Sequence, residues 1–170
     1  MTKNRRIFTT VLRLLALAAT VSATIVMVTS HDSTNVLNLT FKAKYNHSPA
    51  FTYFVIVEAI ISGYNLIILL LSSKGSLWRM VIILDVVAAL LLTSSMSAAL
   101  AIAQVGKEGN THAGWLPICG QVSKFCNHVT GALVAGILAA MFYFVLNLLT
   151  LYNVLNPLFV VKPNQLPWEF

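Results

Sequence analysis

Four long apolar stretches limit what this chain of 170 residues can fold into. They run from Ile7 to Ser30, from Ala50 to Ser72, from Trp78 to Ala103 and from Val129 to Tyr152. A helix needs about 20 mostly apolar residues to cross the roughly 30 Å hydrocarbon core of a bilayer, and each stretch reaches that length. The apolar residues are continuous and do not alternate at period two, which argues against a transmembrane β-barrel. The sequence therefore predicts an all-α integral membrane protein, a bundle of four transmembrane helices.

The composition excludes most soluble functions. Charged residues make up 9% of the chain, whereas an ordinary soluble domain carries about 25%. The net charge of +6 comes from positive residues scattered between the apolar blocks rather than gathered in a patch, so we expect no nucleic-acid partner. The sequence contains no glycine-rich phosphate loop, zinc-protease motif or nucleophile elbow. We therefore expect no enzyme activity, no cofactor and no metal.

The positions of Lys and Arg predict the orientation, because positive residues near span ends are held on the cytoplasmic side. With the N-terminus inside, that side receives more of them than the outer side does. Residues 1–6 then form a cytoplasmic N-terminus and residues 153–170 a cytoplasmic tail. In this tail Pro157, Pro163 and Pro167 should forbid a regular continuation of the fourth helix.

The membrane domain spans residues 7–152, and the predicted elements follow from the apolar stretches. Its helices cover 7–30, 50–72, 78–103 and 129–152, and its outer loops cover 31–49 and 104–128. The first outer loop contains the sequon Asn38-Leu39-Thr40, so Asn38 is a predicted glycosylation site.

Three ionisable residues lie inside the predicted spans: Arg13, Glu58 and Asp85. Each costs about 2.5 to 3.5 kcal/mol if it faces lipid, so each should face the bundle interior and find a partner. Arg13 and Asp85 lie about 9 Å and about 10 Å from the cytoplasmic ends of their helices, which predicts an ion pair. Glu58 lies roughly 8 Å from that level and has three open interpretations: a protonated acid, an acceptor for a neighbouring helix, or a contact with a partner subunit. Tyr64 and Asn65 are expected to complete the hydrogen bonding of Arg13.

Small residues on the fourth helix predict close helix packing. They form two overlapping tracks in which a small residue recurs every four positions, and such tracks let backbones approach closely in lipid. The tracks are Gly131-Ala135-Ala139 and Ala132-Gly136-Ala140.

The second outer loop holds both cysteines, Cys119 and Cys126. On the oxidising side of a membrane, two cysteines at this separation favour a disulfide. Free thiols and a metal site remain as alternatives. A metal would need at least two further ligands, and His112 and His128 flank the loop without forming a typical zinc spacing.

The chain resembles a known family through residues in three regions. They are the basic N-terminus, Arg13 and Asp85 in the first and third helices, and an outer-loop motif of Trp115, Cys119, Phe125 and Cys126. This combination resembles the plant CASP-like family, four-helix proteins related to the Casparian strip membrane domain proteins and more distantly to MARVEL proteins. The segment entering the second helix, 49–54, also resembles the first CASP-like subfamily.

That resemblance implies a multi-pass plasma-membrane protein that forms stable scaffolds with itself or with related CASP-like proteins. In Casparian strip members such platforms exclude lateral diffusion and organise local cell-wall modification. The implied partners are therefore copies or relatives of this chain, membrane lipids and wall-modifying enzymes. The first loop lacks the acidic, Pro- and Phe-rich signature of Casparian strip members, so the resemblance implies the scaffold class rather than that specific role.

The alternative function is a small channel or transporter subunit built around Arg13, Glu58 and Asp85, because intramembrane charges often mark ion pathways. A pathway requires a water-accessible line of polar groups. The sequence offers one charged layer and one further acid, so the scaffold is the preferred interpretation.

Overall fold

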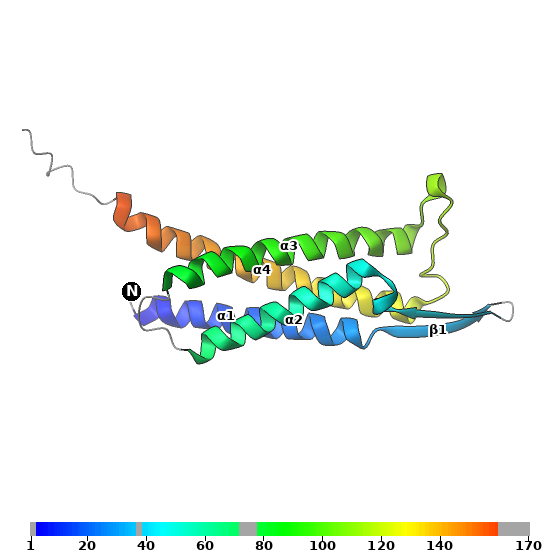
Figure 1. Cartoon of the computed structure of the whole chain (residues 1–170), viewed down its shortest axis with the longest axis horizontal. Helices are drawn as coiled ribbons and strands as arrows, with labels where there is room; N and C mark the ends of the chain where they lie inside the picture. The colour runs from blue at the N-terminus through cyan, green and yellow to red at the C-terminus, as the bar shows by residue number, and fades with distance from the viewer. Residues whose placement is uncertain (1–2, 37–38, 72–77, 160–170) are drawn as a thin grey trace, which may run out of the picture.

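The computed structural model describes residues 3–36, 39–71 and 78–159 and shows four long helices. They are α1 (Lys3–Val28), α2 (Pro49–Leu70), α3 (Trp78–Glu108) and α4 (Ser123–Phe159). Each contains a stretch long and apolar enough to span a membrane, so the predicted four-helix membrane fold is confirmed. The start of α1 and the end of α4 lie at the same end of the bundle (Figure 1).

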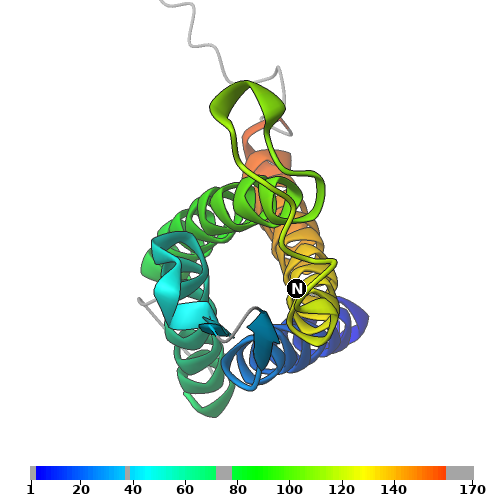
Figure 2. The same ribbon diagram turned by 90° about the vertical axis from the view of Figure 1, so that its right-hand side faces the viewer.

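The four helices form a ring in chain order. Each packs against the next one along the chain, and α4 closes the ring by packing against α1. The end-on view in Figure 2 shows the consequence: α1 lies diagonally opposite α3, and α2 lies diagonally opposite α4. Side chains that join diagonal partners therefore have to cross the centre of the bundle.

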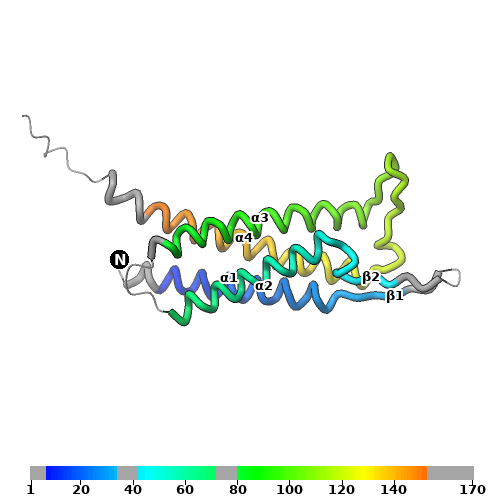
Figure 3. The backbone as a smooth tube through the Cα atoms, in the orientation of Figure 1, coloured from blue at the N-terminus to red at the C-terminus, as the bar shows by residue number. Residues whose placement is uncertain are grey.

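The first outer loop contains a β-hairpin that the apolar pattern did not predict. Strand β1 (His31–Val36) pairs antiparallel with β2 (Leu39–Lys44), with His31 opposite Lys44. The hairpin extends beyond the bundle end where α1 stops and α2 begins, as the backbone trace in Figure 3 shows. We call this the outer end, following the predicted orientation. The glycosylation site predicted at Asn38 lies outside the described residues.

Helices α3 and α4 extend beyond the apolar stretches. Helix α3 continues to Glu108, and the chain then turns at Gly109, which has a positive φ of 72°. A side chain there would place its Cβ 2.6 Å from the carbonyl oxygen of Trp115, so glycine is required. The prediction that Pro157 prevents continuation was wrong, because α4 runs to Phe159. Proline lacks the N–H that would donate to the carbonyl of residue 153, but its fixed φ of about −65° is itself helical, so the helix continues for two more residues.

The core divides into two apolar clusters stacked along the bundle. The outer cluster includes Phe51 and Phe54 of α2, Met96 of α3 and Phe125 of α4. The inner cluster surrounds Tyr143 of α4. Large apolar side chains on all four helices remain exposed on the outside of the bundle, where lipid would cover them.

The small-residue tracks of α4 face the inside of the chain. Ala132, Gly136 and Ala139 are buried, Ala135 and Ala140 are half-buried, and Gly131 is exposed. A Cβ at Gly136 would lie 2.8 Å from the Phe54 ring and 3.0 Å from the Met96 sulfur. The missing side chain therefore lets α2 reach across the diagonal to α4.

We predict that Gly136→Leu destabilises the bundle by about 1 to 3 kcal/mol, the usual effect of overpacking a filled core. The measurement is thermal unfolding of the purified protein in mild detergent. Gly131→Leu is the matched control, because it makes the same substitution on the exposed side of the same helix. Equal stability of the two variants would show that close packing at Gly136 is unimportant.

Candidate functional site

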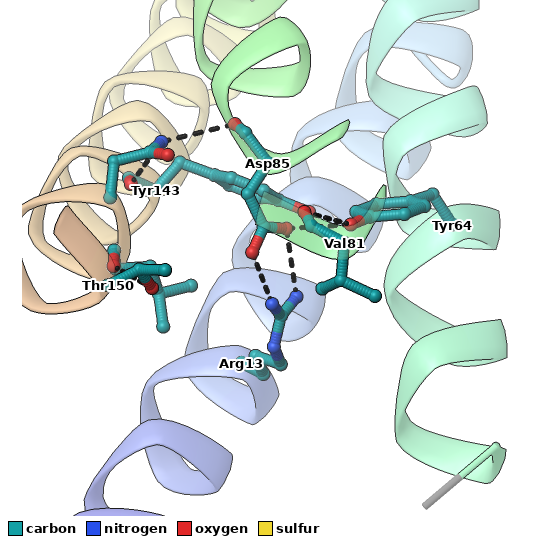
Figure 4. Close-up of polar contacts among 8 residues, drawn as sticks. Arg13, Tyr64, Val81, Asp85, Tyr143 and Thr150 are labelled. Atoms are coloured by element: carbon teal, nitrogen blue, oxygen red, sulfur yellow. Dashed lines mark hydrogen bonds and ion pairs between the residues drawn. The ribbon is translucent and has the colours of Figure 1, made fainter. Parts of the chain in front are cut away.

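The structure brings Arg13 and Asp85 together across the α1–α3 diagonal (Figure 4). Nη1 of Arg13 donates a hydrogen bond to Oδ1 of Asp85 at 3.1 Å, and Nη2 donates to Oδ2. Both residues are buried, with 7% and 1% of their surfaces exposed. This two-point contact is the strongest geometry available to an Arg–carboxylate pair.

The other two helices also contact Asp85. From α2, the Tyr64 hydroxyl donates to Oδ1 at 2.8 Å. From α4, Nδ2 of Asn147 donates to the Asp85 backbone carbonyl at 3.1 Å. All four helices therefore meet at one residue, and we call Arg13, Tyr64, Asp85 and Asn147 the charge layer.

Small neighbours allow this close approach. Ala16 lies one turn after Arg13 and is fully buried, and Ala88 lies one turn after Asp85 and is 2% exposed. An alanine at each of these positions leaves room for the long guanidinium to cross between helices.

The hydrogen-bond partners differ in part from those expected. Tyr64 does contribute to the charge layer, but its hydroxyl donates to Asp85 and not to Arg13. Asn65 is fully buried, and neither of its amide atoms has a hydrogen-bond partner among the described residues. Asn147 was not singled out, although an amide inside the apolar run 129–152 was the signal that could have identified it.

Glu58 stays apart from the charge layer. It is 1% exposed, and neither carboxyl oxygen has a hydrogen-bond partner in the described part of the chain. It faces the interior of its own bundle, so the interpretation as a contact with a partner subunit does not fit. An unpaired carboxylate in such a site would carry a large desolvation cost. That Glu58 is a protonated acid stays a prediction.

The disulfide prediction is confirmed. Cys119 and Cys126 are bonded, with their Cα atoms 5.7 Å apart. Cys126 lies in the first turn of α4, while the backbone N–H groups of Ile118 and Cys119 donate to the Gly106 carbonyl near the end of α3, at 2.9 and 3.3 Å. The disulfide segment 118–126 therefore ties the outer ends of α3 and α4 together.

The two aromatic residues of the outer-loop motif have different positions. Phe125 is buried and packs edge-on against Phe51 of α2, with ring centroids 6.2 Å apart. Trp115 is 58% exposed and forms a pair of backbone hydrogen bonds with Asn110, at 2.8 and 2.9 Å. Phe125 thus anchors the loop to the core, whereas Trp115 lies on its surface. Within the described ranges, no group of three His, Cys, Asp or Glu residues could hold a metal ion.

Comparison with known proteins identifies relatives along nearly the whole chain. The family described as the Casparian strip membrane protein domain matches residues 2–142. CASP-like protein 1C2 of Populus trichocarpa is 66% identical over 163 residues, which cover 96% of this chain and 100% of that protein. CASP-like protein 1C1 of Arabidopsis thaliana is 50% identical over 159 residues, which cover 94% and 97% respectively. No solved structure matches the chain.

The charge layer generates a prediction about single neutralising variants. Asp85→Asn or Arg13→Gln should destabilise the protein by about 3 to 5 kcal/mol, because each leaves a buried charge without its partner. Glu58→Gln is the matched control, because it makes a comparable change to a buried acid that forms no ion pair in the described part of the chain. It should change stability little, as the prediction of a protonated Glu58 requires. A double-mutant cycle on cell-surface expression and on thermal stability measures the coupling. The exchange of Arg13→Asp with Asp85→Arg should recover part of the loss, whereas strictly additive defects would show that the pair does not contribute.

The disulfide generates a second prediction. Cys119→Ser should lower the free energy of unfolding by about 2 to 4 kcal/mol, as expected for removing a native cross-link. Maleimide labelling of denatured protein should modify neither cysteine before reduction and both afterwards. Full labelling without reductant would contradict the bond.

Proposed function

Because this chain belongs to the CASP-like family, subfamily 1C, we propose that it is a non-enzymatic scaffold of the plasma membrane. In this proposal, copies of the chain associate with one another or with related CASP-like proteins into stable platforms. The outer loops face the cell wall and position wall-modifying enzymes. Members of this family are membrane proteins with four spans, and they are typically found in the plasma membrane.

The charge layer is the observation that carries the scaffold proposal. Arg13 and Asp85 neutralise each other, and Tyr64 and Asn147 bind the same aspartate from the remaining helices. A conduction pathway needs polar groups that water can reach along its length. The charges within the described spans instead hold the helices of one chain together, which suits a rigid building block better than a channel.

We place the first contact between copies on the side of α2 that faces lipid. Ala59 and Gly63 lie one turn apart on this face, and both are exposed. A Cβ at Gly63 would meet nothing within 4 Å, so the chain's own packing does not require this glycine. Helices in lipid associate through close packing at small residues, because lipid tails are as apolar as the side chains.

Co-purification of two differently tagged copies in mild detergent tests the assembly. We expect the wild-type chain to recover its tagged partner and to diffuse slowly in the membrane after photobleaching. Gly63→Leu should reduce partner recovery several-fold while leaving thermal stability unchanged, because it blocks close approach only on the outside. Gly136→Leu provides the comparison, since it places the same substitution inside the bundle.

Two results would contradict different parts of the proposal. A wild-type protein that is monomeric in detergent and freely mobile in the membrane would contradict the scaffold function. Full partner recovery with Gly63→Leu would contradict the α2 contact and leave assembly to another face.

A further inference from the structure

A cavity of about 1010 Å³ lies at the outer end of the bundle, away from the charge layer. Its walls come from β2 and the start of α2 on one side, and from the end of α3, the disulfide segment and α4 on the others. Figure 2 looks onto this end of the molecule. The volume lies at the upper limit of the range typical of small-molecule sites, about 300 to 1,000 Å³.

The deeper wall of the cavity is apolar and shares residues with the lipid-facing surface of the bundle. Leu100 of α3 and Leu133, Val134 and Ile137 of α4 contribute to it. Leu100, Val134 and Ile137 are also 42%, 54% and 40% exposed on the outside of the bundle. Hydrocarbon in the surrounding bilayer therefore contacts some of the same residues that line the cavity, which places the cavity beside the acyl region of the bilayer.

The outer rim of the cavity is positively charged. Lys42 and Lys44 of β2 and Lys107 of α3 line it and are exposed, against the single carboxylate of Glu108. Within the part of the chain that the structure describes, none of these lysines forms an ion pair. The rim thus presents unneutralised ammonium groups at the level where lipid headgroups lie.

The length of the cavity fits one leaflet of a bilayer. Its α4 residues extend from Ser123 to Ile137, a distance of about 21 Å at 1.5 Å per residue. Half of the hydrocarbon core is about 15 Å thick, which leaves about 6 Å for a headgroup. A charged rim above an apolar wall of this length is complementary to an anionic amphiphile.

We propose that this cavity binds one membrane lipid with a phosphate-bearing, net anionic headgroup. The phosphate lies among Lys42, Lys44 and Lys107, and an acyl chain runs along Leu133 and Ile137 towards the bilayer centre. The lipid fills the space between the hairpin, α3 and α4 at the outer end.

Native mass spectrometry of the full chain in neutral detergent tests the site. The probes are phosphatidic acid, phosphatidylcholine and glycerol phosphate, which differ in net charge and in the presence of acyl chains. We expect phosphatidic acid to remain bound at one molecule per chain and to raise the unfolding temperature. Phosphatidylcholine and glycerol phosphate should bind at least about tenfold more weakly.

Two pairs of variants separate the rim from the apolar wall. Lys44→Gln combined with Lys107→Gln should weaken phosphatidic acid binding by about tenfold to thirtyfold, the range expected for two lysines near a membrane surface. Lys124→Gln, in the first turn of α4 at the same end of the bundle but not lining the cavity, should change it little. Val134→Trp should fill part of the cavity along its apolar wall and reduce binding, whereas Leu138→Trp, exposed on the same helix outside the lining, should not.

Several outcomes would overturn the lipid assignment. Equal retention of phosphatidylcholine would mean that the headgroup charge is not recognised, and equal binding of glycerol phosphate would indicate a site for a soluble anion. If Val134→Trp altered partner recovery but not lipid binding, the cavity would be a contact between copies. The lipid experiment counts lipids bound to one chain, whereas the scaffold experiment measures recovery of a second copy. Failure of one proposal is therefore distinguishable from failure of the other.

Discussion

The ion pair between Arg13 and Asp85 is the interaction on which the arrangement of the helices depends. In lipid there is no hydrophobic force to bring helices together, so packing and polar contacts must do it. A charge left without a partner has no water to solvate it, and this makes separation of the pair unfavourable. Asp85 also accepts hydrogen bonds from Tyr64 at its carboxylate and from Asn147 at its backbone carbonyl. This one residue therefore links all four helices.

The two diagonal pairs of helices are joined by different interactions at different depths, an ion pair between α1 and α3 and close apolar packing between α2 and α4. Near the inner end, a long polar side chain from α1 reaches α3. Nearer the outer end, the Phe54 ring of α2 reaches the backbone of α4 because residue 136 has no side chain. Beyond that level, the outer ends of α3 and α4 are held by the disulfide segment. Contacts through the centre thus join opposite helices at two depths, and the disulfide restrains the second outer loop. These contacts involve side chains that face the bundle interior and not those that face lipid.

The spans could be predicted because lipid demands continuous apolar length, and the pairing of Arg13 with Asp85 followed from comparing depths along helices. The hairpin could not be found in the same way, because 31–36 is mostly polar and is held by backbone hydrogen bonds. The ends of α3 and α4 were misplaced because apolar length measures the hydrocarbon core, whereas helices continue into the interfacial region. Small residues on α4 predicted close packing, but which helix would approach them depends on the order of helices around the ring. Whether a buried polar group such as Asn65 finds a partner likewise depends on rotation about the helix axis.

The sequence separation within the charge layer has a consequence for how the chain enters the membrane. Arg13 precedes Asp85 by 72 residues, so at synthesis rates of about 5 to 20 residues per second it exists for about 4 to 14 s before its counter-ion is made. During that interval the first helix, although long and apolar enough to span a bilayer, carries a cation without its counter-ion. Tyr64 and Asp85 then emerge in succession, and Asn147 comes last. Pairing of Arg13 therefore waits for the third helix, and Asn147 of the fourth helix adds the last contact to Asp85.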